Sequence, residues 1–170
     1  MQQSFIGSLP KFSCPSLPAQ VFQQTLPVRN TDCVEGASNG DRSPDVVAEV
    51  SAAFERYEHA LVTNDVATLN ALFRIDARTI RYGSAEILYG HDEIAAFRAA
   101  RSPVGLARRR SRTVITTYGA DFAVASTLFY RASAPGKVGR QMQTWVRLAE
   151  GWRIVAAHVS MIEESTPAAT

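Results

Sequence analysis

The apolar residues of this chain change their spacing along the sequence, and that change limits the folds open to it. Val47, Val50, Phe54, Tyr57 and Leu61 follow one another at steps of 3, 4, 3 and 4, which places them on one side of an α-helix. From about residue 110 onward the chain is rich in Val, Ile, Thr and aromatic residues, a composition typical of β-strands. Helical segments followed by strands indicate an α+β protein in which helices pack on a sheet.

Capping and turn residues suggest where these elements begin and end. Ser43 suits the N-cap of the first helix, Asp65 precedes a second short helix, and a third runs from Gly90 to about Arg101. The strand-forming regions are two short segments, 79–82 and 86–89, and four long ones, 110–118, 122–132, 139–148 and 152–162. The sequence therefore predicts an α+β fold: a cone-shaped, curved antiparallel sheet packed on three N-terminal helices, with one internal pocket.

The chain divides near residue 43. Residues 1–43 contain several prolines among Ser, Gln and Asn and show no persistent period, so we interpret them as a disordered leader or a misassigned start. Residues 44–165 form the expected domain, and 166–170 a flexible tail. No apolar run approaches the length of about 18 residues that spans a membrane, and no secretory signal is recognisable, so we expect a cytoplasmic protein without membrane contact.

Composition argues against several classes of function. A net charge of +2 is too small to indicate nucleic-acid binding, and we interpret the basic run at 108–112 as a charged edge that discourages pairing with further strands. The 3 histidines show no metal-ligand spacing, and both cysteines lie in the leader. No Ser or Cys has an evident activating base. We therefore expect neither a metal nor another cofactor.

Several separated stretches carry a resemblance to a known family. They are Pro44–Val50, Phe54–Leu61, Arg81–Gly83, Ile94–Arg101, Arg140–Arg147 and Gly151–Ser160. Together they resemble the nuclear transport factor 2-like, or SnoaL-like, superfamily, and within it the AtzH-like proteins, which include the oxalurate-catabolism protein HpxZ. The resemblance covers about residues 44–162.

The resemblance implies a cone-shaped, usually dimeric protein that binds a small carboxylated substrate in its internal pocket. One AtzH-like branch converts 1,3-dicarboxyurea to allophanate with loss of one carboxyl group as carbon dioxide, and it works beside an amidase-signature enzyme. The family's catalytic tyrosine and arginine fall on Tyr57 and Arg81. Members of the HpxZ type belong to purine and oxalurate breakdown, and the motifs do not choose between the branches.

Arg81 and Tyr57 each leave two interpretations open. The Arg81 guanidinium can hold a carboxylate through two parallel hydrogen bonds, or it can form a structural salt bridge to Glu86 or Glu58. Tyr57 can transfer a proton to a departing nitrogen, or it can be a core tyrosine on the apolar side of the first helix.

Further side chains are candidates for substrate binding. Glu86 can orient Arg81 or act as a base. His158 falls on the same strand face as Ile154 by simple alternation, and it is either a core residue or a participant in the site. Gln143 shares a strand face with Trp145, and whether it reaches the pocket is open. Arg98, together with Arg101 on the third helix, can recognise a second carboxylate or belong to a solvated helix face.

Two classes of function follow from these residues. The first is a cofactor-independent enzyme acting on a carbon–nitrogen bond of a small carboxylated urea. The second is a non-catalytic accessory or binding protein for an amidase of oxalurate or purine breakdown. A site like that of ketosteroid isomerase is disfavoured, because it needs an acidic base in an apolar pocket and Arg81 argues against one. The fold alone cannot separate the first two classes.

Overall fold

The structure is a computed structural model and describes residues 43–164. These residues form three helices and six strands, with the third helix between the second and third strands. The predicted leader, apart from Ser43, and the predicted tail lie outside the described residues. The elements are α1 (Pro44–Val62), α2 (Val66–Ala71), β1 (Ile80–Tyr82), β2 (Ile87–Tyr89), α3 (Gly90–Ala100), β3 (Arg109–Tyr118), β4 (Phe122–Tyr130), β5 (Lys137–Leu148) and β6 (Gly151–Glu163). The predicted α+β fold is confirmed.

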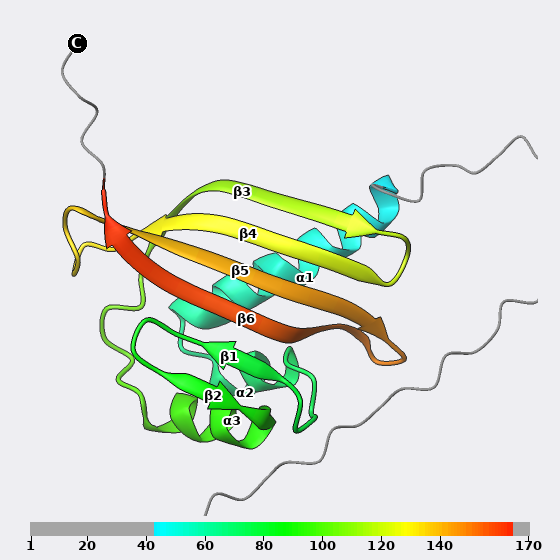
Figure 1. Cartoon of the computed structure of the whole chain (residues 1–170), viewed down its shortest axis with the longest axis horizontal. Helices are drawn as coiled ribbons and strands as arrows, with labels where there is room; N and C mark the ends of the chain where they lie inside the picture. The colour runs from blue at the N-terminus through cyan, green and yellow to red at the C-terminus, as the bar shows by residue number, and fades with distance from the viewer. Residues whose placement is uncertain (1–42, 165–170) are drawn as a thin grey trace, which may run out of the picture. The chain divides into compact units, whose positions relative to one another are not determined.

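All six strands belong to one curved sheet in the order β2-β1-β6-β5-β4-β3 (Figure 1). The four long strands form the predicted antiparallel meander. The short strand β1 pairs with β6 in parallel, with Arg81 opposite Ala157, so the sheet is mixed rather than wholly antiparallel. This pairing between distant parts of the chain places Arg81 beside β6, on the second strand from one edge of the sheet.

The helix α1 crosses one face of the sheet, which we call the inner face, while α2 and α3 lie beside β1 and β2 (Figure 1). Ser43 occupies the N-cap of α1, where its backbone carbonyl accepts a hydrogen bond from Val47 N at 3.0 Å, although its hydroxyl makes no capping bond. Asp65 caps α2 fully, because its carboxylate accepts from Thr68 N at 2.9 Å. These caps fix where the two helices begin.

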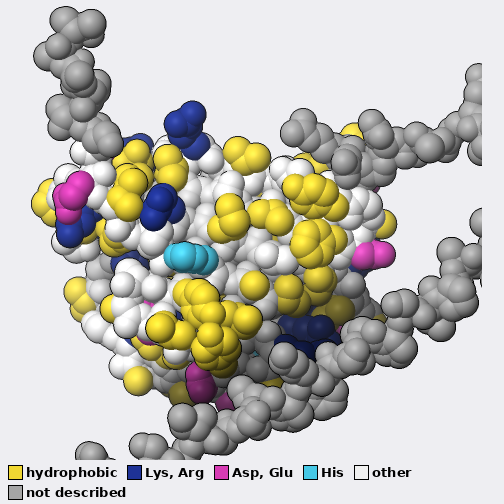
Figure 2. All heavy atoms as spheres, in the orientation of Figure 1, with side chains coloured by type: hydrophobic (Ala, Val, Ile, Leu, Met, Phe, Trp, Pro, Cys, Tyr) yellow, Lys and Arg dark blue, Asp and Glu magenta, His cyan; other side chains and the backbone are white. Residues whose placement is uncertain are grey.

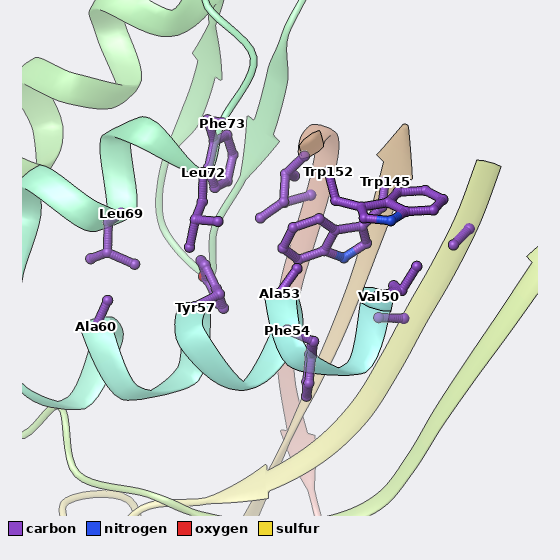
Figure 3. Close-up of a cluster of buried hydrophobic side chains, with 14 of the residues drawn as sticks. Val50, Ala53, Phe54, Tyr57, Ala60, Leu69, Leu72, Phe73, Trp145 and Trp152 are labelled. Atoms are coloured by element: carbon purple, nitrogen blue, oxygen red, sulfur yellow. The ribbon is translucent and has the colours of Figure 1, made fainter. Parts of the chain in front are cut away.

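One end of the inner face is filled by large apolar side chains (Figure 3). Trp145 and Ile154 are fully buried there, and Trp152 is 6% exposed; the two tryptophans lie on the side of α1 that carries Val50 and Ala53 (Figure 3). Burying a side chain of this size stabilises the fold by about 1.5–3 kcal/mol. This cluster therefore supplies much of the energy that holds α1 against the sheet.

A β-bulge in β6 changes which residues face inward. Trp145 pairs with Ile154 but Thr144 pairs with Ala156, so Val155 is an extra residue without a partner on β5. Side chains alternate between the faces of a strand, and one inserted residue reverses that alternation. The prediction that Ile154 and His158 share a face is therefore wrong, because Ile154 points inward and His158 is exposed on the other side.

The outer face of the sheet carries exposed apolar side chains, including Val114, Tyr118, Phe122 and Met142. Figure 2 shows hydrophobic side chains spread across this face, with an exposed histidine among them. None of the helices in residues 43–164 has the length and apolar character needed to cross a membrane.

Candidate functional site

A cavity of about 160 Å³ lies at the end of the inner face that the tryptophans do not fill. Its walls come from α1, the β1–β2 hairpin, α3 and its following loop, and the inner faces of β4, β5 and β6. The lining residues are Tyr57, Leu61, Arg81, Ser84, Glu86, Phe97, Arg101, Leu106, Arg108, Phe129, Arg131, Gln141, Val159 and Met161. The predicted Tyr57, Arg81 and Glu86 thus line one small, partly enclosed cavity.

Arg81 forms a salt bridge with Glu86 across the β1–β2 hairpin. Both side chains are largely buried, with 12% and 18% of their surfaces exposed, and the guanidinium lies over the Phe97 ring at 5.0 Å. Gly83 makes room for this pair, because a Cβ there would lie 1.9 Å from a Glu86 carboxylate oxygen. A guanidinium has five N–H donors, so Arg81 keeps donors for a ligand while Glu86 fixes its orientation.

Tyr57 combines a packed ring with a free hydroxyl. The residue is 4% exposed, and its ring packs against Phe73 at 6.4 Å between centroids (Figure 3). Its hydroxyl makes no hydrogen bond to another residue of the described chain, although a buried tyrosine hydroxyl normally has a partner. The hydroxyl is therefore available to a molecule in the cavity.

Arg108 lies inside the cavity wall and is neutralised by Glu58 of α1. The Arg108 side chain is 1% exposed, and its Nε donates to Glu58 Oε2 at 3.0 Å. Gln141 closes the group, since its Nε2 donates to Glu58 Oε1 at 2.9 Å and its Oε1 accepts from Arg108 at 3.0 Å. The interpretation of the run 108–112 as a charged edge is thus wrong for its first residue, which turns inward to a buried carboxylate.

Two further arginines of the lining have no carboxylate partner within residues 43–164. Arg101 donates from Nη2 to the Asn64 side-chain oxygen at 3.0 Å, and Arg131 lies over Phe129 with its buried Nε unpaired. Burial lowers the pKa of the Arg131 guanidinium, and the charge of Arg108 lowers it further. Burial also lowers the pKa of Arg101, with Arg81 and Arg131 adding to the effect. Guanidinium groups remain charged at neutral pH, so the cavity is strongly positive.

Arg98, a predicted substrate-binding residue, does not line the cavity. It is 3% exposed and donates from Nη1 to the Leu69 carbonyl at 2.8 Å and to the Asn70 side-chain oxygen at 3.0 Å. Its guanidinium lies 4.2 Å from the Phe73 ring centroid, and burial lowers its pKa to about 10. Arg98 therefore neither lies on a solvated helix face nor contacts the cavity. It links α3 to α2 instead.

The other two predicted binding residues also lie away from the cavity lining. Gln143 points inward and is 1% exposed, and neither end of its amide has a hydrogen-bond partner among the described residues. It lies one inward position beyond Gln141, toward Trp145. His158 is exposed on the outer face, edge-on to Tyr82 at 6.2 Å between ring centroids. The sheet therefore separates His158 from Tyr57 and Arg81.

Sequence reasoning missed Glu58, Gln141 and Arg131 as parts of the site. For Arg131 a signal was present, since it continues the inward alternation of Ala123, Ala125 and Phe129 along β4. Within residues 43–164, no group of three or more His, Cys, Asp or Glu side chains is placed to hold a metal ion. The arrangement that the described chain does hold is a tyrosine hydroxyl among arginines.

Comparisons with known proteins agree with this architecture. The chain matches the AtzH-like family over residues 41–165. It belongs to the AtzH-like family. A search of curated proteins gave no match.

Solved structures extend the comparison. A protein of unknown function of the DUF3225 family from Pectobacterium atrosepticum is 58% identical, with a TM-score of 0.72 over 74% of this chain and 98% of that one. A cystatin-like fold protein from Burkholderia xenovorans is 51% identical, with a TM-score of 0.71 over 74% and 98% of the two chains. A nuclear transport factor 2-like superfamily protein from Salmonella enterica is 22% identical, with a TM-score of 0.58 over 76% and 99%, and this likeness shows the fold alone. The predicted AtzH-like family is thus confirmed, and the fold is that of nuclear transport factor 2-like proteins.

Proposed function

We propose that this AtzH-like protein is a cofactor-independent enzyme of nitrogen catabolism that removes one carboxyl group from a small carboxylated urea. The proposed reaction converts 1,3-dicarboxyurea to allophanate and carbon dioxide. The observation that carries the proposal is the meeting of the free Tyr57 hydroxyl and the Arg81 guanidinium in one partly enclosed cavity. At about 160 Å³, the cavity is smaller than a typical drug-sized pocket and suits a small metabolite.

Arg81 would bind and orient a carboxylate of the substrate. Glu86 holds the guanidinium in place, so a bound carboxylate meets donors that are already positioned. Its positive charge would also stabilise the negative charge that develops on the urea group as the carbon–nitrogen bond breaks. The low exposure of Arg81 strengthens both effects, because water screens a buried charge less.

Tyr57 would supply the proton that the reaction consumes. When the bond between the departing carboxyl carbon and the nitrogen breaks, its electrons remain on the nitrogen and carbon dioxide leaves. The Tyr57 hydroxyl would donate its proton to that nitrogen, and the tyrosinate would then recover a proton from water. Arg101 and Arg131 line the same cavity and would place positive charge around the group that loses its proton in this step.

A non-catalytic role beside an amidase is the second candidate, and the exposed apolar side chains of the outer face favour it. The two functions differ in what Tyr57 does. An accessory protein would support its partner through its surface, so removing a hydroxyl inside the cavity would leave that support unchanged.

The test follows allophanate formation from 1,3-dicarboxyurea that an amidase generates in place, with and without this protein. We expect acceleration by the wild type, a loss of about 100-fold or more in kcat for Tyr57→Phe, and a comparable loss for Arg81→Met. Tyr118→Phe is the matched control, since Tyr118 is 51% exposed on the outer face. Circular dichroism would verify that each variant is folded. A folded wild type that gives no acceleration would refute the decarboxylation.

A further inference from the structure

The charges of the cavity wall do not balance. Four arginines line it: Arg81, Arg101, Arg108 and Arg131. Glu86 neutralises Arg81, and Glu58 neutralises Arg108. Within the described chain Arg101 and Arg131 form no salt bridge, so the wall carries two positive charges in excess. A partly desolvated excess of this kind is unfavourable without an anion.

The two arginines without a carboxylate partner among the described residues line the same cavity. Each is partly desolvated, and the positive charge of Arg131 contributes to the lowered pKa of Arg101. Arg131 has one buried donor, Nε, with no hydrogen-bond partner among residues 43–164. Its guanidinium is supported by the buried ring of Phe129, which in turn occupies the space that a Cβ at Gly139 would need. The chain thus holds Arg131 at the cavity although packing alone would favour an apolar side chain there.

We propose that Arg101 and Arg131 form a second carboxylate-binding subsite, distinct from Arg81, so that the cavity selects a molecule with two carboxylates. The inference rests on the proposed function and deepens it, because 1,3-dicarboxyurea carries two carboxylates and a ureido acid such as oxalurate carries one. The two excess charges match a dianion. After one carboxyl group has left as carbon dioxide, allophanate keeps a single carboxylate and loses one of the two contacts, which favours product release.

A binding measurement tests the subsite without turnover. Glutarate places two carboxylates on a chain of the same length as 1,3-dicarboxyurea, whereas butyrate has one carboxylate. By isothermal titration calorimetry, we expect the full-length wild type to bind glutarate at least about 10-fold more tightly than butyrate. Arg131→Met and Arg101→Met should each weaken glutarate binding by about 10-fold and remove most of the preference for glutarate over butyrate.

Arg109→Met is the matched control, because Arg109 stacks on Tyr130 at 4.3 Å and does not line the cavity. It should keep the wild-type preference for glutarate. Equal binding of glutarate and butyrate by the wild type would overturn the subsite, as would a preference that survives in both Arg131→Met and Arg101→Met.

The result of the binding test can be distinguished from the result of the decarboxylation assay. A protein that prefers glutarate but does not release carbon dioxide from 1,3-dicarboxyurea would keep the subsite and refute the decarboxylation. A protein that turns over the urea but does not prefer glutarate would keep the activity and refute the subsite.

Discussion

The two ends of the sheet's inner face are filled in opposite ways. At one end Trp145 and Trp152 are buried against the side of α1 that carries Val50 and Ala53 (Figure 3). At the other end the same helix contributes Tyr57 and Glu58, and the sheet meets them with arginines around a cavity. Both ends use α1 and the long strands of the sheet, and the arginine end adds the β1–β2 hairpin and α3.

This contrast separates stability from binding along one helix. Apolar packing at the tryptophan end stabilises the domain in proportion to the area it buries. The arginine end contributes less to stability, because desolvating charges opposes much of the gain from their ion pairs. A domain stabilised at one end can therefore maintain an unfavourable charge distribution at the other, where a ligand needs it.

The largest effect is expected at the tryptophan end. Trp145→Ala removes a fully buried side chain and should lower the free energy of unfolding by about 3–5 kcal/mol, measured by chemical denaturation. Turnover by the fraction that remains folded should change little, because Trp145 does not line the cavity. Ile75→Ala, at a position that is 81% exposed, is the control and should have almost no effect on stability. A Trp145→Ala protein that is stable but inactive would contradict the separation of stability at one end from binding at the other.

A smaller loss is expected from the buried ion pair of the arginine end. Glu58→Gln leaves Arg108 buried without a counter-charge and should destabilise the protein by about 3 kcal/mol. Glu55→Gln tests the same chemistry one helical turn away, where the carboxylate is 60% exposed and pairs with Arg110 at 2.7 Å. That exposed pair should contribute about 0.5 kcal/mol or less. Equal losses from the two substitutions would show that burial of the pair is not what matters.

The smallest effect should have the opposite sign. Arg131→Met removes a partly buried cation without a carboxylate partner within residues 43–164, and we expect the ligand-free protein to gain about 1 kcal/mol of stability. Thermal unfolding with and without glutarate provides the measurement. Glutarate should raise the melting temperature of the wild type and have a much smaller effect on Arg131→Met. Destabilisation by Arg131→Met in the absence of ligand would instead assign this arginine a structural role.

The sequence predicted what depends on local pattern. The spacing of Val50, Phe54 and Tyr57 located α1, and the β-rich composition located the long strands close to their observed bounds. The parallel pairing of β1 with β6 has no local signal, because β1 has only 3 residues and its partner lies far along the chain. The position of Arg81 in the sheet could therefore be inferred only from the family resemblance.

The site itself was predicted in part. Tyr57, Arg81 and Glu86 line the same cavity, whereas His158 lies on the opposite face because a bulge interrupts the alternation of β6. The Glu58–Arg108 pair joins residues that are 50 positions apart, and nothing in a dense basic run marks which of its members turns inward. Such contacts are set by tertiary packing, which residue spacing does not encode.

The extra residue, Val155, also determines which positions of β6 correspond to one another when relatives are compared. On the C-terminal side of this point, Ala157, Val159 and Met161 face the helix and cavity, and His158 and Ser160 face outward. A relative lacking the insertion would present the opposite set to its ligand even with an identical sequence on either side. Gain or loss of one amino acid at this position thus exchanges the side chains of β6 that face the cavity with those that face outward. Binding specificity can change in this way without any substitution.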